Sequence, residues 1–205
     1  MEAMIRVADE SDAEGMLEIY APIVLETAIS FEAQPPTVAE FQGRIRASLE
    51  RRLWLVCDAG GRIAGYAYAT QFNPRDSYIW SVEVSVYVHP GFHRRGIGRA
   101  LYTSLFRCLA AQGYCTAVAR ITLPNPSSVT LHEAMGFRPV GVNEGIGYKN
   151  GEWRDVGIWQ MDISPRPLQP QPPLTFTSLA GTLEWDNALA EGAALLKSRG
   201  ADVRP

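Results

Sequence analysis

The chain has 205 residues, of which 46% are hydrophobic, which is enough for one globular domain with an extension. Its formal net charge of −3 argues against the basic surface of a nucleic-acid-binding protein, so we expect no nucleic-acid partner. Cys57, Cys108 and Cys115 are far apart and form no CxxC pair, which argues against a disulfide framework and a zinc site. We therefore expect reduced thiols, no bound metal and a cytoplasmic protein.

No targeting or membrane segment is predicted. Residues Met1 to Asp9 lack the basic and then apolar pattern of a signal peptide. No stretch of the sequence is long and apolar enough to span a bilayer, so we expect no membrane partner.

The N-terminal quarter of the chain predicts one strand and two helices. A short strand is expected over Met4–Ala8, and Ser11–Glu14 reads as a capping box that opens a helix. Pro22 interrupts the apolar spacing of this helix and is expected to bend it. A second capping box, Thr37–Glu40, opens a helix over Phe41–Glu50.

The rest of the first 163 residues predicts strands that alternate with helices. A hairpin is expected from Leu53–Asp58 and Ile63–Thr70, because a Gly-Gly turn separates two apolar runs. The later elements are a long central strand Tyr78–Val88, a helix after Gly96, a strand Cys115–Ile121, a short helix from about Ser127 to Met135, and strands near Phe137–Ile146 and Asp155–Ile163. This order predicts an α/β fold with a mixed sheet.

The composition changes after Ser164, which predicts three segments: a domain over residues 1–163, a proline-rich linker over 164–174 and a tail over 175–205. Five prolines make the linker stiff and extended. The tail carries an amphipathic helix over Leu183–Lys197, which docks on the domain, on a second subunit, or nowhere.

A glycine-rich turn follows the central strand and is a candidate anion site. Such a turn at the start of a helix leaves backbone N–H groups unpaired, and the helix dipole adds positive charge there. Alternatively, the glycines serve only the turn. The spacing matches neither the dinucleotide fingerprint nor the Gly-Lys-Ser/Thr phosphate loop. The candidate phosphate-binding residues are His93, Arg94, Arg95, Gly96, Ile97, Gly98 and Arg99.

The element order and this turn resemble the GNAT acetyltransferases. The match is Gly96-x-Gly98, with His93 where that family has Gln or Arg. Within the superfamily, the chain looks like the phosphinothricin and methionine sulfoximine N-acetyltransferases, and the resemblance covers roughly Ile5 to Ile163. The matching segments are Ser81–Val88, Leu123-Pro124-Asn125, Leu131–Phe137 and Gly147–Gly157.

The resemblance implies a GNAT fold, in which a mixed, mostly antiparallel sheet is flanked by helices and splayed at its central strands. It implies acetyl-CoA as co-substrate, a homodimer, and direct acetylation of the α-amine of a small amino acid or analogue in a ternary complex. The alternatives are another amine, such as a polyamine, an aminoglycoside or a protein N-terminus, and a non-catalytic CoA-binding domain. Glu83 and His132 argue against a domain that only binds.

Glu83 is the first candidate catalytic residue. It lies among valines of the central strand. Burial there would disfavour the charged form and raise the pKa of the carboxyl group toward neutrality, which suits a base that takes a proton from an amine. The alternatives are a carboxylate on the open face of the sheet or a structural ion pair. The resemblance implies that Glu83 is the base.

His132 is the second candidate and lies on the short helix before Gly136. A lone histidine on a helix is more often a satisfied structural residue. The resemblance implies that His132 acts as a general acid toward the CoA thiolate or as a second proton acceptor for the amine.

Other cofactor contacts follow from the resemblance. Backbone groups of Val86, Tyr87 and Val88 are expected to bind the pantetheine arm and the oxyanion that forms during acyl transfer. Asn125 is expected to reach the pantetheine amides or to serve only as a turn residue. Ser128 is expected to contact the cofactor or to lie near the helix cap.

The candidate acceptor contacts are Arg75, Phe31, Tyr78 and Trp153. An arginine fork at Arg75 suits a carboxylate or phosphinate. Phe31 and Tyr78 line the pocket or belong to the core. Glu32 stands where herbicide-detoxifying relatives have arginine, which weakens the case for phosphinothricin as the best substrate. The last hairpin, which carries Trp153, is expected to help form the dimer and to complete the pocket.

Overall fold

A seven-stranded sheet with the strand order β1-β2-β3-β4-β5-β7-β6 forms the centre of the structure, a computed structural model that describes residues 3–49 and 51–200. The strands are β1 (Ala3–Val7), β2 (Trp54–Ala59), β3 (Ile63–Gln71), β4 (Ser81–Val88), β5 (Thr116–Thr122), β6 (Arg138–Lys149) and β7 (Glu152–Asp162). Neighbouring strands are antiparallel except β4 and β5, which run parallel. The predicted mixed, mostly antiparallel sheet is confirmed.

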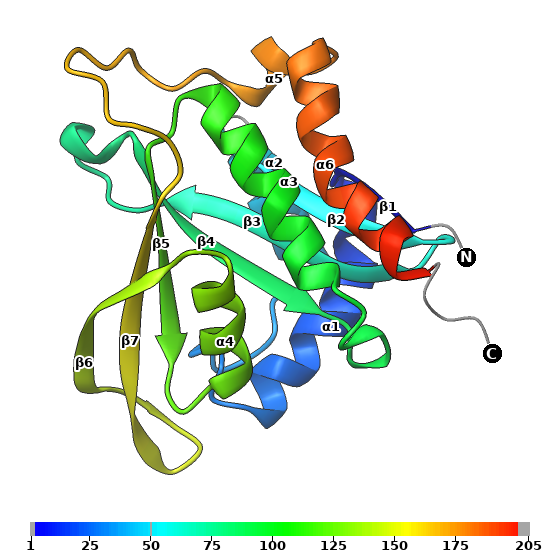
Figure 1. The fold of residues 1–205 in the computed structure, drawn as a ribbon. Helices are drawn as coiled ribbons and strands as arrows, with labels where there is room; N and C mark the ends of the chain where they lie inside the picture. The colour runs from blue at the N-terminus through cyan, green and yellow to red at the C-terminus, as the bar shows by residue number, and fades with distance from the viewer. Residues whose placement is uncertain (1–2, 50, 201–205) are drawn as a thin grey trace.

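Helices cover both faces of the strands β1 to β4 (Figure 1). The helices are α1 (Ala13–Glu26), α2 (Val38–Leu49), α3 (Ile97–Gln112), α4 (Pro126–Ala134), α5 (Phe176–Leu179) and α6 (Leu183–Gly200), with short 3-10 turns η1 (Glu10–Asp12), η2 (Asp76–Tyr78) and η3 (Pro90–Phe92). Helices α3 and α6 lie on one face, and α1 and α2 lie on the other.

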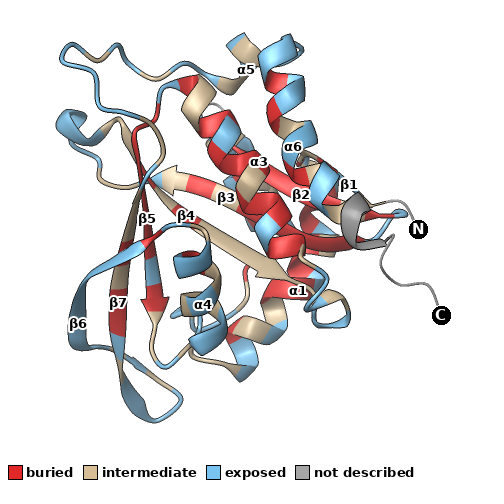
Figure 2. Ribbon diagram, viewed as in Figure 1, coloured by how far each residue is buried: buried red, intermediate tan, exposed pale blue. Residues whose placement is uncertain are grey.

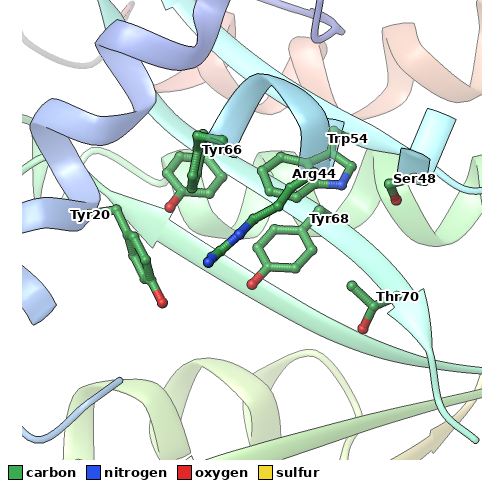
Figure 3. Close-up of a pocket in the computed structure, with 8 residues that line it drawn as sticks. Tyr20, Arg44, Ser48, Trp54, Tyr66, Tyr68 and Thr70 are labelled. Carbon is green, nitrogen blue, oxygen red and sulfur yellow. The ribbon is translucent and has the colours of Figure 1, made fainter. Parts of the chain in front are cut away.

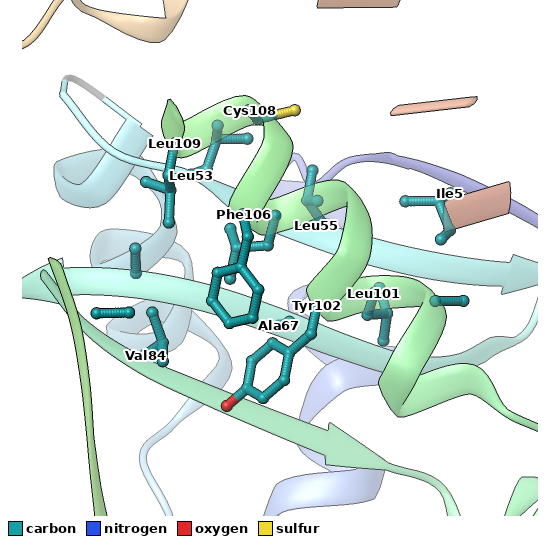
Figure 4. Packing of buried hydrophobic residues seen from close by; sticks show 14 of the residues in the cluster. Ile5, Leu53, Leu55, Ala67, Val84, Leu101, Tyr102, Phe106, Cys108 and Leu109 are labelled. Carbon is teal, nitrogen blue, oxygen red and sulfur yellow. The ribbon is translucent and has the colours of Figure 1, made fainter. Parts of the chain in front are cut away.

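Two apolar clusters hold these layers together. On one face, Tyr102 and Phe106 of α3 pack over Leu55 and Val84 of the sheet (Figure 4). The second cluster joins α1 and α2 to the opposite face and includes Trp54. Figure 2 shows buried residues concentrated in β2 to β5 and α3, whereas most of β6 is exposed. The strands near the middle of the sheet are therefore the rigid part that positions side chains.

The central strand is shorter than predicted and begins at Ser81 rather than Tyr78. The residues before it form η2, in which the Tyr78 N–H donates to the Arg75 carbonyl at 3.0 Å and the Ile79 N–H donates to Asp76. The segment Asn73–Ser77 is rich in turn-forming residues, and this local preference outweighs the apolar pattern that follows it.

One of the two predicted capping boxes is wrong. The box lies one turn earlier, at η1 just before α1, and is formed by Asp9 and Asp12 rather than by Ser11–Glu14. Asp9 accepts from the Ser11 N–H at 2.7 Å, and Asp12 accepts from the Asp9 N–H at 2.9 Å. Asp12 is also buried against Arg6, which favours this earlier register. The predicted box of Thr37–Glu40 is confirmed.

Some predicted boundaries fall outside the described residues. These are Met1 and Glu2 at the N-terminus, Glu50 at the end of the second predicted helix, and residues 201–205 of the tail. Helix α1 is continuous through Pro22.

The C-terminal tail docks on the domain of its own chain. Trp185 and Ala188 of α6 are buried in the α3 cluster, and the Ser104 hydroxyl of α3 donates to the Leu189 carbonyl at 2.8 Å. A Cβ atom at Gly192 would collide with the Ala100 carbonyl, so the two helices approach closely at that point. The linker before α6 is extended and joined to the domain, because the Leu174 N–H donates to the Gln112 carbonyl at 2.8 Å.

Candidate active site

A cleft opens where β4 and β5 stop pairing. The two parallel strands pair only over Ser81–Glu83 and Thr116–Val118, and then they diverge (Figure 1). Strand β4 still pairs with β3 along its length, so from Val84 onward only its β5-facing backbone groups lack a strand partner. The predicted splay is confirmed. The cleft is lined by Ile29, Val84, Ser85, Val86, Tyr87, Ala119, Arg120, Ile121, Thr122, Asn125, Ser128 and His132.

Glu83 lies at the last paired position before the strands diverge. Arg120 of β5 binds its carboxylate, with Nε donating to Oε2 at 2.8 Å. The Glu83 side chain is 22% exposed and that of Arg120 is 52% exposed. The expectation of an isolated carboxyl group buried among valines is therefore wrong, because the valines point to the opposite face, toward α3. The alternative of an ion pair is confirmed, and the role of base stays a prediction.

His132 forms one wall of the cleft and is buried. Its Nδ1 lies 2.8 Å from the Ser128 carbonyl, and its Nε2 lies 2.9 Å from the Tyr102 hydroxyl. A carbonyl oxygen only accepts, so Nδ1 carries the proton and Nε2 accepts from Tyr102. Burial lowers the pKa of His132 below its ordinary value of 6.5, although the hydrogen bond to Ser128 opposes this shift. The ring is therefore neutral at pH 7, which argues against a role as an acid, and its Nε2 lone pair is occupied by Tyr102.

This burial predicts a dependence of folding stability on pH. Below pH 6.5 His132 takes up a proton in the unfolded state, whereas in the native state it stays neutral until a lower pH. The contribution of His132 to folding stability is therefore complete above pH 6.5 and is lost as the pH falls from 6.5 toward the lower native pKa. We expect the melting temperature of the wild type to fall more steeply between pH 7.5 and 5.5 than that of His132→Asn. Equal slopes, measured by calorimetry, would contradict this assignment.

The glycine turn has the geometry of an anion site. Gly96 caps α3 with φ of 82°, and Arg94 also has a positive φ of 62°, so the chain turns tightly before the first helical N–H groups. The side chains of Arg94, Arg95 and Arg99 are exposed around this helix start. His93 contributes to the turn itself, because its Nε2 hydrogen-bonds the Val88 carbonyl at 3.0 Å. The chain therefore offers backbone donors and exposed positive charge at one place.

Asn125 and Ser128 both line the cleft and together cap α4. The Asn125 Oδ1 atom accepts from the Ser128 N–H at 3.2 Å, so Asn125 is the helix cap, and Ser128 lies near that cap as one of its two predicted roles requires. Capping uses one oxygen of Asn125 and a backbone group of Ser128. It therefore leaves the Asn125 amide N–H groups as candidate cofactor contacts, together with the O–H of Ser128, whose oxygen lies 3.3 Å from His132 Nδ1.

A cavity of about 310 Å³ lies beside the cleft, between α1, α2 and the sheet (Figure 3). Thr70 and Tyr68 of β3 line it and pair with Glu83 and Ser85 of β4, respectively. Side chains of directly paired residues lie on the same face of a sheet, so the Glu83 carboxylate and the cavity share one face. The lining residues are Tyr20, Phe41, Arg44, Ser48, Trp54, Tyr66, Tyr68 and Thr70.

Lys149 holds the loop that carries Phe31 and Glu32. Its Nζ atom donates to the carbonyls of Val24, Ser30 and Glu32 at 2.7, 2.5 and 2.9 Å. Phe31 lies over β6, where a Cβ atom at Gly147 would collide with its ring. The hairpin β6–β7 therefore fixes the loop between α1 and α2.

Glu32 is paired rather than free. Arg44 donates to its two carboxylate oxygens at 2.6 and 3.0 Å, and the Tyr20 hydroxyl donates at 2.9 Å. The hydrogen bond from Arg44 holds the pKa of Glu32 below its usual value. The pair has no net charge, so Glu32 does not repel an anion as a lone carboxylate would.

The other predicted acceptor contacts lie apart from the cleft and cavity. Arg75 and Tyr78 are exposed in the loop before β4, and neither lines the cleft or the cavity. Trp153 on β7 is 69% exposed and packs against Tyr148. Their roles in substrate binding stay predictions.

The cysteines lie outside this site. All three are buried, and none lines the cleft or the cavity. Burial raises the pKa of the Cys57 thiol to about 11 and that of Cys108 to about 12, so neither is a reactive thiolate at neutral pH. Among residues 3–49 and 51–200, no group of three or more His, Cys, Asp or Glu side chains is placed to hold a metal ion. Within the same part of the chain, no helix has the length and apolar character needed to cross a membrane.

Four residues near the site were not predicted: Arg120, Tyr102, Arg44 and Lys149. Arg120 and Arg44 are cations on a strand and a helix whose acidic partners are 37 and 12 residues away in sequence. No local pattern marks such pairs. Tyr102 reads as one of several apolar residues on α3, and only its contact with His132 distinguishes it.

Comparisons with known proteins agree with this geometry. Residues 5–158 match the family described as Acetyltransferase (GNAT) domain. A phosphinothricin N-acetyltransferase from Streptomyces viridochromogenes is 39% identical over 170 residues, which cover 81% of this chain and 93% of that protein. An L-methionine sulfoximine/L-methionine sulfone acetyltransferase from Pseudomonas aeruginosa is 32% identical and covers 80% and 97% of the two chains.

The fold also matches a solved structure. A phosphinothricin acetyltransferase from Sinorhizobium meliloti, determined in complex with acetyl-CoA, superposes with a TM-score of 0.78 at 32% identity over 86% of this chain and 99% of that one. The family match, the sequence identities and the splayed sheet agree, and this chain belongs to the GNAT acetyltransferase family.

Proposed function

We propose that this protein transfers the acetyl group of acetyl-CoA to the α-amine of a small amino acid or analogue. The observation that carries the proposal is the position of Glu83, between the open edge of β4 and a cavity on the same face of the sheet. The relatives are named for phosphinothricin and for methionine sulfoximine and sulfone, and we propose the same compounds as the leading acceptors.

Acetyl-CoA supplies the thioester, and the residues of this chain bind it and move protons. The N–H groups after Gly96, with the neighbouring arginines, suit its pyrophosphate. The unpaired edge of β4 at Val86–Val88 suits the pantetheine arm and the carbonyl oxygen that becomes negative. Amide groups of Asn125 and the hydroxyl of Ser128 lie on the facing wall of the cleft.

Glu83 takes a proton from the attacking amine, directly or through a water, while the new N–C bond forms and the C–S bond breaks. His132 is neutral, and its Nε2 lone pair accepts from Tyr102, so it acts as a second proton acceptor only when that hydrogen bond opens. The departing thiolate takes a proton from water in the open cleft, and Glu83 returns its proton to solvent as CoA leaves. No cysteine lines the cleft or the cavity, which favours direct transfer in a ternary complex over an acyl-enzyme.

Release of the CoA thiol with a panel of amines tests the proposal. We expect turnover with phosphinothricin, methionine sulfoximine and methionine sulfone, and little with spermidine or an aminoglycoside. Turnover with only the cationic amines would keep the reaction but overturn the acceptor assignment. Binding of acetyl-CoA without thiol release from any amine would support a non-catalytic CoA-binding domain instead.

We also propose a cytoplasmic homodimer. Three unpaired cysteines suit a reducing compartment. The hairpin β6–β7 exposes a row of apolar side chains, which suits a subunit interface: Val140, Val142, Ile146, Tyr148 and Trp153. Sedimentation velocity that shows only monomers at micromolar concentration would overturn the dimer.

A further inference from the structure

We propose that Arg62 and His89 form an anion site beside the glycine turn and bind the phosphate monoester on the ribose of CoA. The turn itself suits the pyrophosphate, so this inference assigns a second phosphate of the same cofactor to residues outside the turn. It goes beyond the proposed function, because it concerns cofactor binding and holds whichever amine is acetylated.

Arg62 and His89 meet at the β3 edge of β4. Arg62 precedes β3 and His89 follows β4, and the two strands are antiparallel neighbours in which Gly65 pairs with Val88. The His89 N–H donates to the Ala64 carbonyl at 3.0 Å, which extends this pairing. The sheet register therefore fixes the contact in which Arg62 Nη2 lies 2.9 Å from His89 Nε2.

The contact between these two nitrogens lacks an acceptor. His89 Nδ1 accepts from the Gly91 N–H at 3.0 Å, so the proton of the imidazole ring is on Nε2. The guanidinium group of Arg62 only donates. Two N–H groups therefore converge on one region, and an anionic oxygen that accepts from both of them completes the arrangement.

The surroundings carry positive charge that is not neutralised by a carboxylate. The centroid of the Phe92 ring lies 5.9 Å from the Cζ atom of Arg62 and 5.2 Å from that of Arg95, so the ring connects Arg62 to the turn. Over the part of the chain that the structure describes, four arginines of this region form no ion pair with Asp or Glu: Arg62, Arg94, Arg95 and Arg99.

The position of the pair identifies the phosphate. The cleft that suits the pantetheine arm lies on the β5 side of β4, whereas Arg62 and His89 lie on the β3 side. In CoA the pyrophosphate joins the pantetheine arm to the adenosine, so a pyrophosphate at the turn sends the two parts in different directions. The ribose of the adenosine carries the phosphate monoester, and Arg62 with His89 supplies donors on that side.

Calorimetric binding of CoA and dephospho-CoA tests the site. Dephospho-CoA keeps the pyrophosphate and the adenosine and lacks only the phosphate monoester. We expect the wild type to bind CoA about 10-fold more tightly than dephospho-CoA, and we expect Arg62→Gln to remove most of this preference by weakening the binding of CoA alone. An equal loss of affinity for both compounds would place Arg62 against the pyrophosphate and would overturn the proposal.

The matched control is Arg107→Gln. Arg107 is also an exposed arginine, but it pairs with Glu191 of α6 rather than lying beside the turn. Both variants remove one positive charge, so Arg107→Gln reports the effect of net charge on an anionic ligand. We expect it to change each affinity by less than about two-fold. A loss of the CoA preference as large as that in Arg62→Gln would overturn the local site.

His89→Asn tests the second donor. Asparagine keeps a side-chain oxygen that accepts from the Gly91 N–H, and the substitution removes the ring N–H. We expect the preference for CoA to fall by about three-fold or more, with the affinity for dephospho-CoA unchanged. An unchanged preference in folded His89→Asn would overturn the shared site.

Titration with inorganic phosphate distinguishes the cofactor from a free anion. If the wild type bound CoA and dephospho-CoA equally and also bound inorganic phosphate in a manner that depends on Arg62, the pair would be a site for a free anion and the proposal would be overturned. All these measurements read binding. A protein that shows the expected CoA preference but acetylates no amine would therefore contradict the proposed function and support this site.

Discussion

Replacing Glu83 with glutamine is expected to lower kcat by about 10²-fold or more, while the affinity for acetyl-CoA stays within about two-fold of the wild type. Free amino-acid amines are mostly protonated at neutral pH, and a protonated amine cannot attack the thioester. Glutamine keeps the size of the side chain and removes its ability to take a proton. Steady-state kinetics and calorimetric titration with acetyl-CoA measure the two quantities separately.

The ion pair with Arg120 provides the control. If Glu83 were only a structural partner of Arg120, then removing either side chain would have similar consequences. The Arg120 side chain is half exposed, and ion pairs of this kind contribute about 1 kcal/mol or less to stability. We therefore expect Arg120→Gln to retain far more activity than Glu83→Gln. Near-wild-type turnover in Glu83→Gln, or equal losses in both variants, would remove Glu83 from the mechanism.

The order of the elements was predictable because it depends on local signals. Alternating valines predicted β4, a Gly-Gly turn predicted the β2–β3 hairpin, and Thr37 with Glu40 predicted the start of α2. Signals of this kind act over a few residues, so the sequence displays them directly. The errors lie where two local signals compete, as at Asp9 and Ser11, where either residue can cap the helix.

The environment of the site was less predictable, because it depends on contacts between distant segments. The valines around Glu83 suggested burial, but alternation along the strand places them on the other face. The departure at Glu32 suggested a repulsive charge, and only the fold brings Arg44 to neutralise it. In the same way, nothing in the linker composition indicated that α6 docks on α3 through a close contact at Gly192.

Gly98→Val is expected to weaken the binding of acetyl-CoA by roughly 10- to 100-fold. Gly98 lies at the start of α3, between the open edge of β4 and helix α4. A Cβ atom there would stand 3.1 Å from the Leu131 Cδ2 atom and 3.7 Å from Val88 Cγ2. The branched side chain therefore crowds the packing between α3, α4 and β4 and displaces the start of α3, whose first N–H groups face the expected pyrophosphate. Overpacking of this kind costs about 1–3 kcal/mol. When this cost falls on the complex with acetyl-CoA, it corresponds to the expected 10- to 100-fold loss of affinity, at about 1.4 kcal/mol for each factor of ten.

Gly43→Val is the matched control, because a Cβ atom at Gly43 on α2 meets nothing within 4 Å. Both variants replace a helical glycine with valine, and only the Gly98 position brings the new side chain against neighbouring residues. Thermal melts establish that both are folded before their affinities are compared. Unchanged acetyl-CoA affinity in folded Gly98→Val would count against the glycine turn as the pyrophosphate site. A loss confined to Gly98→Val, set beside the retained affinity of Glu83→Gln, would separate cofactor binding at α3 from proton transfer at β4.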